Sequence, residues 1–286
     1  MPELPEVETI RTGLASVLVG RRLRRVEARR PDLRFPFPKG FVQRLTGARV
    51  EALTRRGKYM LAGLDRRLTL LIHLGMTGRF EIEGGPDGGV GDFAIAAPAD
   101  PKHAHVLFET DDDIRITFFD ARRFGFMDLV EDDALAGHPR LAHLGPEPLG
   151  VSFDGPYLEH AFADRRQSAK TLLLDQSIVA GLGNIYVCEA LYRARVSPTK
   201  AAGTIRRRQL QRLVAEIRSV LDEAIDKGGS TLRDFAATDG SLGYFQHSFA
   251  VYDRERQPCH SPRCNGVIQR AVQSGRSTFY CPVCQT

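Results

Sequence analysis

The sequence predicts an α+β protein in which strands come first, helices follow and a small metal-binding module ends the chain. Apolar and polar residues alternate through much of the first half, helical periodicity dominates the region after it, and two close cysteine pairs lie at the end. These changes of pattern divide the chain into a β domain at residues 1–136, a linker at 137–156, a helical domain at 157–250 and a metal-binding module at 251–286.

The composition is that of a globular protein with an excess of positive charge. The 286 residues are 42% hydrophobic and 26% charged, with a net charge of +5, which favours a polyanionic partner such as nucleic acid. No apolar run approaches the ~20 residues that a membrane span needs, so we expect no membrane partner. No secretory signal precedes the charged residues that begin at Glu3. We therefore expect a cytoplasmic protein whose five cysteines form no disulfide framework.

The β domain is predicted to begin with a helix at residues 3–19, which Gly20 ends. Its apolar positions recur at helical spacing and are Val7, Ile10, Leu14 and Val17. Alternating segments such as RLTLLIHLG and IRITFFDARRFGFMDLV follow, and the turn sequences LDRR and DDD separate them. This pattern predicts the hairpins of an antiparallel sandwich or barrel. A glycine-rich loop, or partly disordered insert, is expected at residues 84–101.

Four segments of the helical domain have helical periodicity: PYLEHAFADRR, SAKTLLLDQ, NIYVCEALYRAR and IRRRQLQRLVAEIRSVLDEAIDK. The last is predicted to be the longest helix because its apolar residues form one continuous face, which consists of Leu210, Leu213, Val214, Ile217, Leu221 and Ala224. Cys188 lies on an apolar helical face and is predicted to be a core residue.

Two close cysteine pairs predict a metal site at the C-terminus. Four residues separate the first pair and two separate the second; the cysteines are Cys259, Cys264, Cys281 and Cys284. Four thiolates satisfy tetrahedral Zn²⁺ and leave no open position, so we predict one structural zinc ion. The sequence between the pairs is typical of a hairpin, and its turn would hold Arg276 outward.

The first residues, MPELPEVET, allow two interpretations. Proline after methionine followed by glutamate is an ordinary way to begin a helix. Removal of Met1 would instead free the secondary amine of Pro2 beside the carboxylate of Glu3. Amines that attack sugar carbons form Schiff bases, and a neighbouring acid can protonate what leaves. On these residues alone the helix start is the simpler interpretation.

Three motifs in order, PELPE, GLGNIY and FYCPVC preceded by GR, resemble the formamidopyrimidine-DNA glycosylase family over essentially the whole chain. The resemblance implies an N-terminal helix with a two-layer antiparallel β-sandwich, a helix–two-turns–helix domain and a four-cysteine zinc finger hairpin. It also implies a base-excision repair enzyme that removes oxidised purines (8-oxoguanine, formamidopyrimidines) from duplex DNA. Strand cleavage by AP-lyase β,δ-elimination would follow, and we expect a monomer.

The family's catalytic positions match Pro2, Glu3, Lys58 and Arg276. The resemblance implies that Pro2 attacks C1′ of the damaged nucleotide and that Glu3 protonates the sugar ring oxygen. Lys58 matches a catalytic lysine, and Arg276 is assigned both a phosphate contact and the later elimination. Glu6 lies in the same motif, where a role in the site and stabilisation of the helix start stay open.

The implied DNA contacts are spread along the chain. Asn184 matches a phosphate-binding asparagine, and matching positions are also occupied by His73, His103 and Lys170. Arg166 stands where the resemblance implies a basic residue, often lysine. For the two histidines, a purely structural role stays an alternative. The implied wedge, which fills the space left by an extruded base, consists of Met76, Arg122 and Phe124.

Two departures and two rival functions stay open. The first cysteine pair has four intervening residues where two are common, and the region after Gly228, through 238–244, resembles a flexible lesion-covering loop. An endonuclease-VIII-like enzyme for oxidised pyrimidines is the nearer rival, although its opening usually has glycine at the position of Leu4. A non-catalytic zinc-dependent protein that binds damaged DNA is the other, and it would not need Pro2, Glu3 or Lys58.

Overall fold

The computed structural model describes residues 2–84, 99–230 and 243–286. It separates into two compact units, one of Met1–Ala142 with Lys227–Tyr244 and one of His143–Asp226 with Phe245–Thr286. The first unit therefore includes a segment that follows the helices in the sequence. The predicted glycine-rich loop and the predicted lesion-covering loop fall largely on 85–98 and 231–242, outside the described residues.

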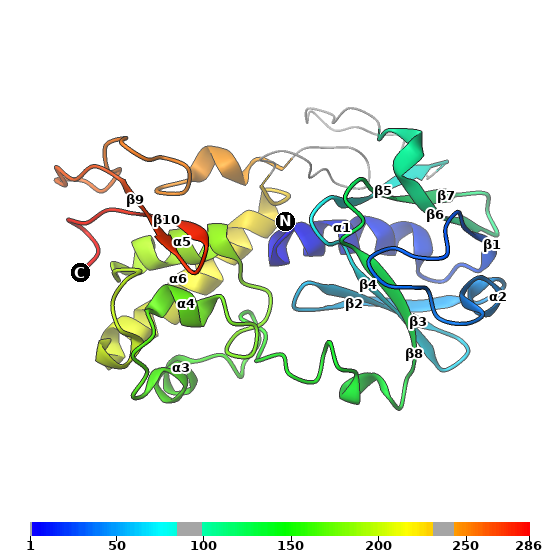
Figure 1. Cartoon of the computed structure of the whole chain (residues 1–286), viewed down its shortest axis with the longest axis horizontal. Helices are drawn as coiled ribbons and strands as arrows, with labels where there is room; N and C mark the ends of the chain where they lie inside the picture. Colours follow the sequence, from blue (N-terminus) through cyan, green and yellow to red (C-terminus); the bar gives the residue numbers. More distant parts are fainter. Residues whose placement is uncertain (1, 85–98, 231–242) are drawn as a thin grey trace. The chain divides into compact units, whose positions relative to one another are not determined.

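The first unit contains two four-stranded antiparallel sheets (Figure 1). One has the order β1-β6-β7-β5 and the other β2-β3-β4-β8. The strands are β1 Leu23–Ala28, β2 Val50–Arg56, β3 Tyr59–Leu64, β4 Leu68–His73, β5 Gly78–Glu83, β6 Ala104–Thr110, β7 Arg115–Asp120 and β8 Phe126–Glu131. One hydrophobic core takes buried residues from both sheets, among them Phe118 of β7 and Ile72 of β4. The predicted two-layer sandwich is thus confirmed.

Helix α1, Leu4–Leu18, runs alongside β2 and β3 (Figure 1). Its predicted apolar positions are buried in the core, namely Val7, Ile10, Leu14 and Val17. The helix begins at Leu4 because Glu3 and Glu6 form a capping box that satisfies amides of the first turn. Gly20, at φ +87°, follows the helix end as predicted. The remaining short elements of this unit are α2 Phe41–Leu45, η1 Pro101–His103 and η2 Leu135–Gly137.

The second unit contains the predicted helices and the C-terminal hairpin. The helices are α3 Gly155–Phe162, α4 Ala169–Leu173, α5 Asn184–Ala194 and α6 Arg207–Asp226, with the short turns η3 Ala202–Thr204 and η4 Phe245–Ser248. The predicted apolar face of α6 is buried, and α5 packs against α6. Within the described part of the chain, no helix has both the length and the apolar character needed to cross a membrane.

The hairpin consists of β9, Gln269–Gln273, and β10, Arg276–Tyr280. Its turn residues Ser274 and Gly275 have φ of +49° and +71°, which is the left-handed backbone of a tight two-residue hairpin turn. Arg276 is therefore the first residue of β10, directly after the turn.

Candidate functional site

The N-terminal end of α1 is fixed by the buried carboxylate of Glu6. Its Oε2 accepts the amide N–H of Glu3 at 2.8 Å. Its Oε1 accepts the amide N–H and the hydroxyl of Ser230 at 2.8 and 3.0 Å. Pro2 and Glu3 are buried beside it. Glu6 thus holds the backbone next to Pro2, a role that the sequence left open.

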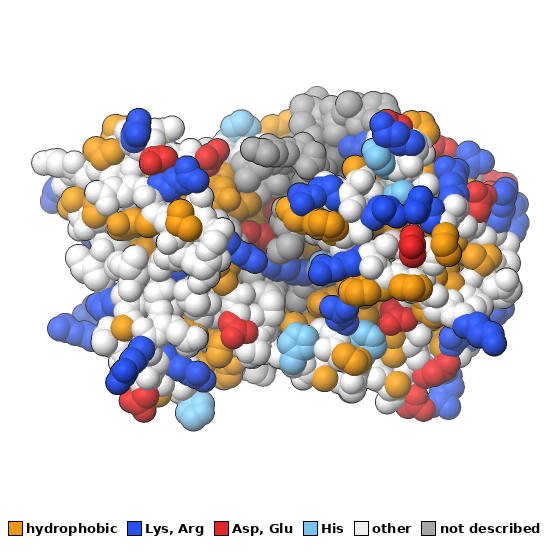
Figure 2. All heavy atoms as spheres, in the orientation of Figure 1, with side chains coloured by type: hydrophobic (Ala, Val, Ile, Leu, Met, Phe, Trp, Pro, Cys, Tyr) orange, Lys and Arg blue, Asp and Glu red, His pale blue; other side chains and the backbone are white. Residues whose placement is uncertain are grey.

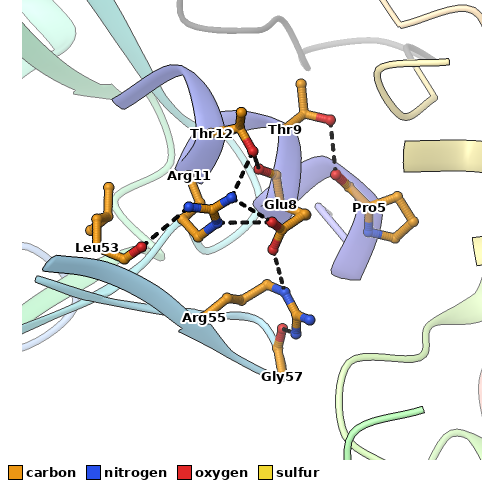
Figure 3. A network of polar contacts seen from close by, with 8 residues as sticks. All are labelled: Pro5, Glu8, Thr9, Arg11, Thr12, Leu53, Arg55 and Gly57. Atoms are coloured by element: carbon orange, nitrogen blue, oxygen red, sulfur yellow. Dashed lines mark hydrogen bonds and ion pairs between the residues drawn. The ribbon is translucent and has the colours of Figure 1, made fainter. Parts of the chain in front are cut away.

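Lys58 is buried on the turn between β2 and β3, and α1 anchors that turn (Figure 3). Arg55 donates from Nε to Glu8 Oε2 and from Nη1 to the carbonyl of Gly57, each at 2.9 Å. Arg11 donates to the other oxygen of Glu8 at 2.8 Å. Helix α1, which follows the predicted nucleophile Pro2, is therefore joined to the strand end that precedes Lys58.

The carboxylate of Glu8 is partly buried between two guanidinium groups. Burial raises the pKa of Glu8, but the hydrogen bonds and charges of Arg11 and Arg55 outweigh burial and hold the pKa below its usual value. Glu8 therefore carries its charge throughout the neutral range. An ionised carboxylate between two arginines is a strong connection between α1 and β2.

His73, the last residue of β4, has its ring stacked on Phe126 and in tilted contact with Tyr59. The ring centroids lie 4.9 Å from Tyr59 and 5.6 Å from Phe126. Burial, aided by the positive charges of Lys58, Arg34 and Arg140, lowers the pKa of His73 to about 4. Nδ1 accepts the amide N–H of Gly75 at 3.1 Å, so the neutral ring carries its proton on Nε2. His73 can therefore donate to an anion without being charged.

The predicted wedge residues come from two neighbouring loops. Met76 follows β4, and Arg122 and Phe124 lie between β7 and β8. The Arg122 guanidinium lies 4.7 Å from the centroid of the Phe124 ring, which is 40% exposed. A large aromatic side chain left in solvent on a rigid loop is available for contact with a partner.

Asp120, at the end of β7, joins the two wedge loops and was not singled out from the sequence. Its buried carboxylate accepts the amide N–H of Gly125 at 2.7 Å and the hydroxyl of Thr77. Thr77 in turn accepts the amide N–H of Arg122 at 3.0 Å. The loops approach so closely that a Cβ on Gly75, at φ +66°, would lie 2.3 Å from the amide nitrogen of Gly125. In the sequence, the one sign of this role for Asp120 was an acidic residue directly after the run ITFF.

Three predicted DNA-contact residues of the second unit meet at the start of β10. The fully buried Lys170 donates from Nζ to the carbonyl of Ser277 at 2.9 Å and to Thr278 Oγ1 at 2.7 Å. Asn184 donates from Nδ2 to the same Ser277 carbonyl at 2.9 Å. Arg276, the residue before, is exposed. The structure thus gives Lys170 and Asn184 an internal role, holding the strand that presents Arg276.

The structure does not bring the two remaining predicted DNA-contact residues, Arg166 and His103, into the clusters described above. Arg166 is exposed on the loop between α3 and α4. His103 ends the turn before β6 and is partly buried. Within the described residues, no side-chain hydrogen bond of His103 is found. Both stay predictions.

The four C-terminal cysteines converge on one point, with all four sulfurs within 4.8 Å of one another. The Sγ atoms of Cys259 and Cys284 lie 3.7 Å apart, as do those of Cys264 and Cys281. A tetrahedron with Zn–S bonds of about 2.3 Å has edges of about 3.8 Å, so the sulfurs fit one Zn²⁺. They are too far apart for disulfides, and the four-residue spacing of the first pair does not prevent convergence.

Neighbouring groups complete the metal site. The Tyr192 hydroxyl lies 3.2 Å from Cys259 Sγ, and the Gly266 amide donates to Cys264 Sγ at 3.3 Å. Such donors favour thiolates and orient them for a cation. The predicted single structural zinc ion fits this donor set. Cys188 lies in the adjacent hydrophobic cluster, as predicted.

Family models match three parts of the chain. Residues 1–127 match the formamidopyrimidine-DNA glycosylase N-terminal domain, 144–236 match the formamidopyrimidine-DNA glycosylase H2TH domain, and 257–286 match the zinc finger found in FPG and IleRS.

The chain is also similar to proteins matched over their full length. It is 63% identical over 287 residues to a protein of Caulobacter vibrioides named formamidopyrimidine-DNA glycosylase, with 100% of both chains covered. The crystal structure of the MutM (FPG) protein from Thermus thermophilus has a TM-score of 0.83 at 38% identity, covering 99% of this chain and 98% of that one. A complex between the Lactococcus lactis Fpg and an abasic site containing DNA has a TM-score of 0.85 at 33% identity, covering 99% of each chain.

Proposed function

The chain belongs to the formamidopyrimidine-DNA glycosylase family, and on that premise we propose that it excises oxidised purines, 8-oxoguanine and formamidopyrimidines, from duplex DNA and then cleaves the strand as an AP lyase. The observation that carries the proposal is the buried start of α1, where Pro2 precedes Glu3 and Glu6 fixes the backbone between them. The relatives' named activity and their DNA-bound structures support the same reaction.

Pro2 is the proposed nucleophile after loss of Met1. Its amine attacks C1′, and the bond to the damaged base breaks with its electron pair leaving on the base, which takes up the proton that the Pro2 nitrogen loses. Glu3 donates a proton to the sugar ring oxygen, so that the opened sugar stays bound through an iminium. A secondary amine gives an iminium with no proton to lose, which therefore persists as an electron sink. Removal of a C2′ proton then expels the 3′ phosphate, and a second elimination, assigned to Arg276, expels the 5′ phosphate.

The proposed DNA contacts divide into donors that grip phosphate and side chains that replace the extruded base. Lys58 supplies positive charge beside the reacting nucleotide, and His73 supplies an uncharged N–H. Asn184, Arg166, His103 and Arg276 complete the phosphate contacts, and Lys170 acts through the strand that carries Arg276. In the wedge, Phe124 enters the stack, Met76 fills the void and Arg122 faces the orphaned base.

The proposed zinc ion is structural. Four thiolates would close its coordination sphere and leave no position for water. Its chemistry is limited to holding the ends of the β9–β10 hairpin, and the hairpin presents Arg276. We also propose that the protein works as a monomer. It acts on chromosomal DNA in the bacterial cytoplasm, a location that the bacterial source of its relatives supports.

Borohydride trapping on matched duplexes tests the function. Duplexes with 8-oxoguanine or a formamidopyrimidine should give a covalent adduct through residue 2 and a cleaved strand, and thymine glycol should react more slowly. Faster reaction with thymine glycol would favour an endonuclease-VIII-like specificity. Binding without an adduct would favour a damage-binding protein. An added residue before Pro2 that left trapping intact would exclude Pro2 as the nucleophile.

A further inference from the structure

Two arginines outside the predicted site lie against one exposed aromatic ring. The guanidinium carbon of Arg34 lies 5.6 Å from the centroid of the Phe35 ring, and that of Arg140 lies 4.6 Å from it. Arg140 is also 5.3 Å from the centroid of Phe126. Arg34 and Arg140 come from segments more than 100 residues apart. We name them the Phe35 arginine pair.

The backbone around the pair is held in place. The amide of Arg34 donates to the carbonyl of Gly125 at 3.0 Å, which joins it to the wedge loop. The Phe35 ring meets Phe126 edge-on, with centroids 5.7 Å apart. The amide of Arg140 donates to His138 Nδ1 at 3.3 Å. Arginines supported by aromatic faces and a fixed backbone lose less freedom when they bind a ligand.

The pair carries two positive charges at the surface of the first unit. Within the residues that the structure describes, neither arginine forms an ion pair. The acidic neighbours face other groups: Asp32 lies 3.7 Å from Arg123, and Asp128 lies 3.3 Å from His138. Figure 2 shows Lys and Arg side chains interspersed with hydrophobic ones on the face of the first unit that the view presents. A pair of guanidinium groups attracts an anion.

Contacts connect the Phe35 arginine pair to His73 on one side and to the wedge residues on the other. Phe126, which supports Arg140, stacks on His73 with an interplanar angle of 17°. The charges of both arginines contribute to the low pKa of His73. Arg34 also lines a cavity of about 400 Å³, whose other lining residues are Asp32, Leu33, Arg122, Arg123 and Phe124. The pair therefore lies on the surface between the predicted phosphate donor and the predicted wedge.

We propose that the Phe35 arginine pair is a further binding site for the phosphodiester backbone of duplex DNA. The inference rests on the proposed function, because a duplex held by His73 and the wedge would pass over this surface. A guanidinium with its face on an aromatic ring keeps the N–H groups of its edge for a phosphate, to which it can donate two parallel hydrogen bonds.

The salt dependence of binding to an undamaged duplex tests the pair. Arg34→Ala and Arg140→Ala should each reduce the slope of log Kobs against log salt by about 0.9, the value for one phosphate contact. Arg140→Lys should keep the slope, because it keeps the charge. Arg44→Ala is the matched control, because Arg44 is on the same unit and paired with Glu131 at 2.6 Å; its slope should be unchanged. Unchanged slopes for both pair variants would overturn the proposal.

A scan of neutral methylphosphonates along each strand identifies the partner. At one position, the methylphosphonate and Arg140→Ala should remove largely the same affinity. The two changes together should then weaken binding by less than the sum of their separate losses. Additive losses at every position would overturn the proposal, and they would assign the pair to free anions instead. Inorganic phosphate that competes with wild-type protein but not with Arg140→Ala at constant ionic strength would support that reassignment.

One control variant and two results with wild-type protein distinguish a failure of this inference from a failure of the proposed function. Phe35→Leu keeps an apolar side chain but removes the ring, so it should lower affinity less than Arg140→Ala while leaving the melting temperature close to that of the wild type. Wild-type protein that binds duplex but cannot be trapped by borohydride would sink the proposed function and leave the salt-slope test valid. Wild-type protein that is trapped normally, with slopes unaffected by either arginine, would sink only this inference.

Discussion

His73 is a histidine that its surroundings keep neutral. Burial and three nearby cations lower its pKa from 6.5 to about 4, and Gly75 fixes its tautomer. A neutral donor contributes a hydrogen bond to phosphate without releasing a counterion, so its loss should weaken DNA binding without changing the salt slope. The same pKa has a consequence for folding.

The free energy of unfolding should fall between pH 6.5 and 4, in part because of His73. In this interval the unfolded chain binds the proton and the folded chain does not, so acid favours unfolding. His73→Gln should make this part of the pH profile flatter. Urea unfolding at several pH values measures it, with His160→Gln as the control because that histidine is exposed on α3. Parallel profiles for His73→Gln and wild type would contradict the assignment.

Arg122 is the residue from which we expect selectivity for the opposite base. A guanidinium offers only donors, and cytosine presents two adjacent acceptors on its pairing edge, whereas adenine presents one acceptor beside a donor. A good bidentate contact discriminates by roughly 1–3 kcal/mol. Excision of 8-oxoguanine should therefore be about tenfold to a hundredfold faster opposite cytosine than opposite adenine. Single-turnover rates on the two duplexes measure the ratio.

Two variants test that assignment. Arg122→Ala should reduce the ratio, mainly by slowing excision opposite cytosine. Phe124→Ala should slow both duplexes, because a ring in the stack does not read the base. A ratio that Arg122→Ala leaves unchanged would place the discrimination elsewhere.

At the scale of elements, the connection between α1 and β2 positions two predicted catalytic groups together. Glu8→Gln should weaken both ion pairs and lower the free energy of unfolding by about 1 kcal/mol, a value discounted for partial exposure. The pKa of Glu8 is below its ordinary 4.5, so this stabilisation is present above that pH and is lost as the pH falls further. Borohydride trapping should slow because the turn before Lys58 loses its anchor.

Glu83→Gln is the matched control for that prediction, because Glu83 is exposed and its ion pair with Arg115, at 3.3 Å, joins two strands far from the turn. Its trapping rate and stability should stay close to those of the wild type. Equal trapping rates for Glu8→Gln and wild type would show that α1 does not position Lys58.

The start of β10 is the second element whose support is testable. Lys170→Met removes a buried ammonium that binds two groups of the strand, so the strand should lose its fixed position. DNA affinity should fall about tenfold, as expected for about 1.4 kcal/mol. The loss should be much smaller when Arg276→Ala is already present, because Lys170 then has no phosphate contact to support.

Titration of fluorescent duplex with the single and double variants measures this coupling. Lys200→Met is the control, since the Nζ of Lys200 makes a long contact of 3.4 Å to the carbonyl of Thr286 in the same unit. Fully additive losses would instead favour a direct contact between Lys170 and DNA.

At the scale of the whole molecule, zinc should affect DNA binding more than the chemistry at the N-terminus. Cys281→Ser should lose metal and DNA affinity together, because the hairpin that presents Arg276 loses its support. The first unit contains Pro2 and Glu3 and none of the four cysteines. Metal analysis and duplex titration measure the two losses. Normal affinity in a folded, zinc-free protein would contradict a structural role.

Local patterns of sequence predicted the parts of the fold that depend on local burial. The apolar faces of α1 and α6 follow the 3.6-residue period, and the four cysteines are close in sequence as well as in space. Both layers of the sandwich also followed from period-2 segments, although the choice between sandwich and barrel needed the family resemblance. The prediction of Pro2 as nucleophile also needed the resemblance, because Pro2 and Glu3 alone favour an ordinary helix start.

The contacts that complete the candidate site could not be predicted, because their partners are distant in sequence. Glu6 meets Ser230 across 224 residues, and Lys170 meets Thr278 across 108. No periodicity reports such a pairing. Lys170 was expected to contact DNA because it matches a family position, and its burial depends on partners on β10 that no local pattern reveals. For the same reason the return of Lys227–Tyr244 to the first unit was not foreseen.

The bond between Glu6 and Ser230 sets an order of events during synthesis. Residues 6 and 230 leave the ribosome 224 residues apart, an interval on the order of 10 to 45 seconds at about 5–20 residues per second. Until then the Glu6 carboxylate, which steadies the start of the chain, lacks its contact with Ser230. A nascent polypeptide that ends before Ser230 therefore lacks one of the contacts that hold the start of α1.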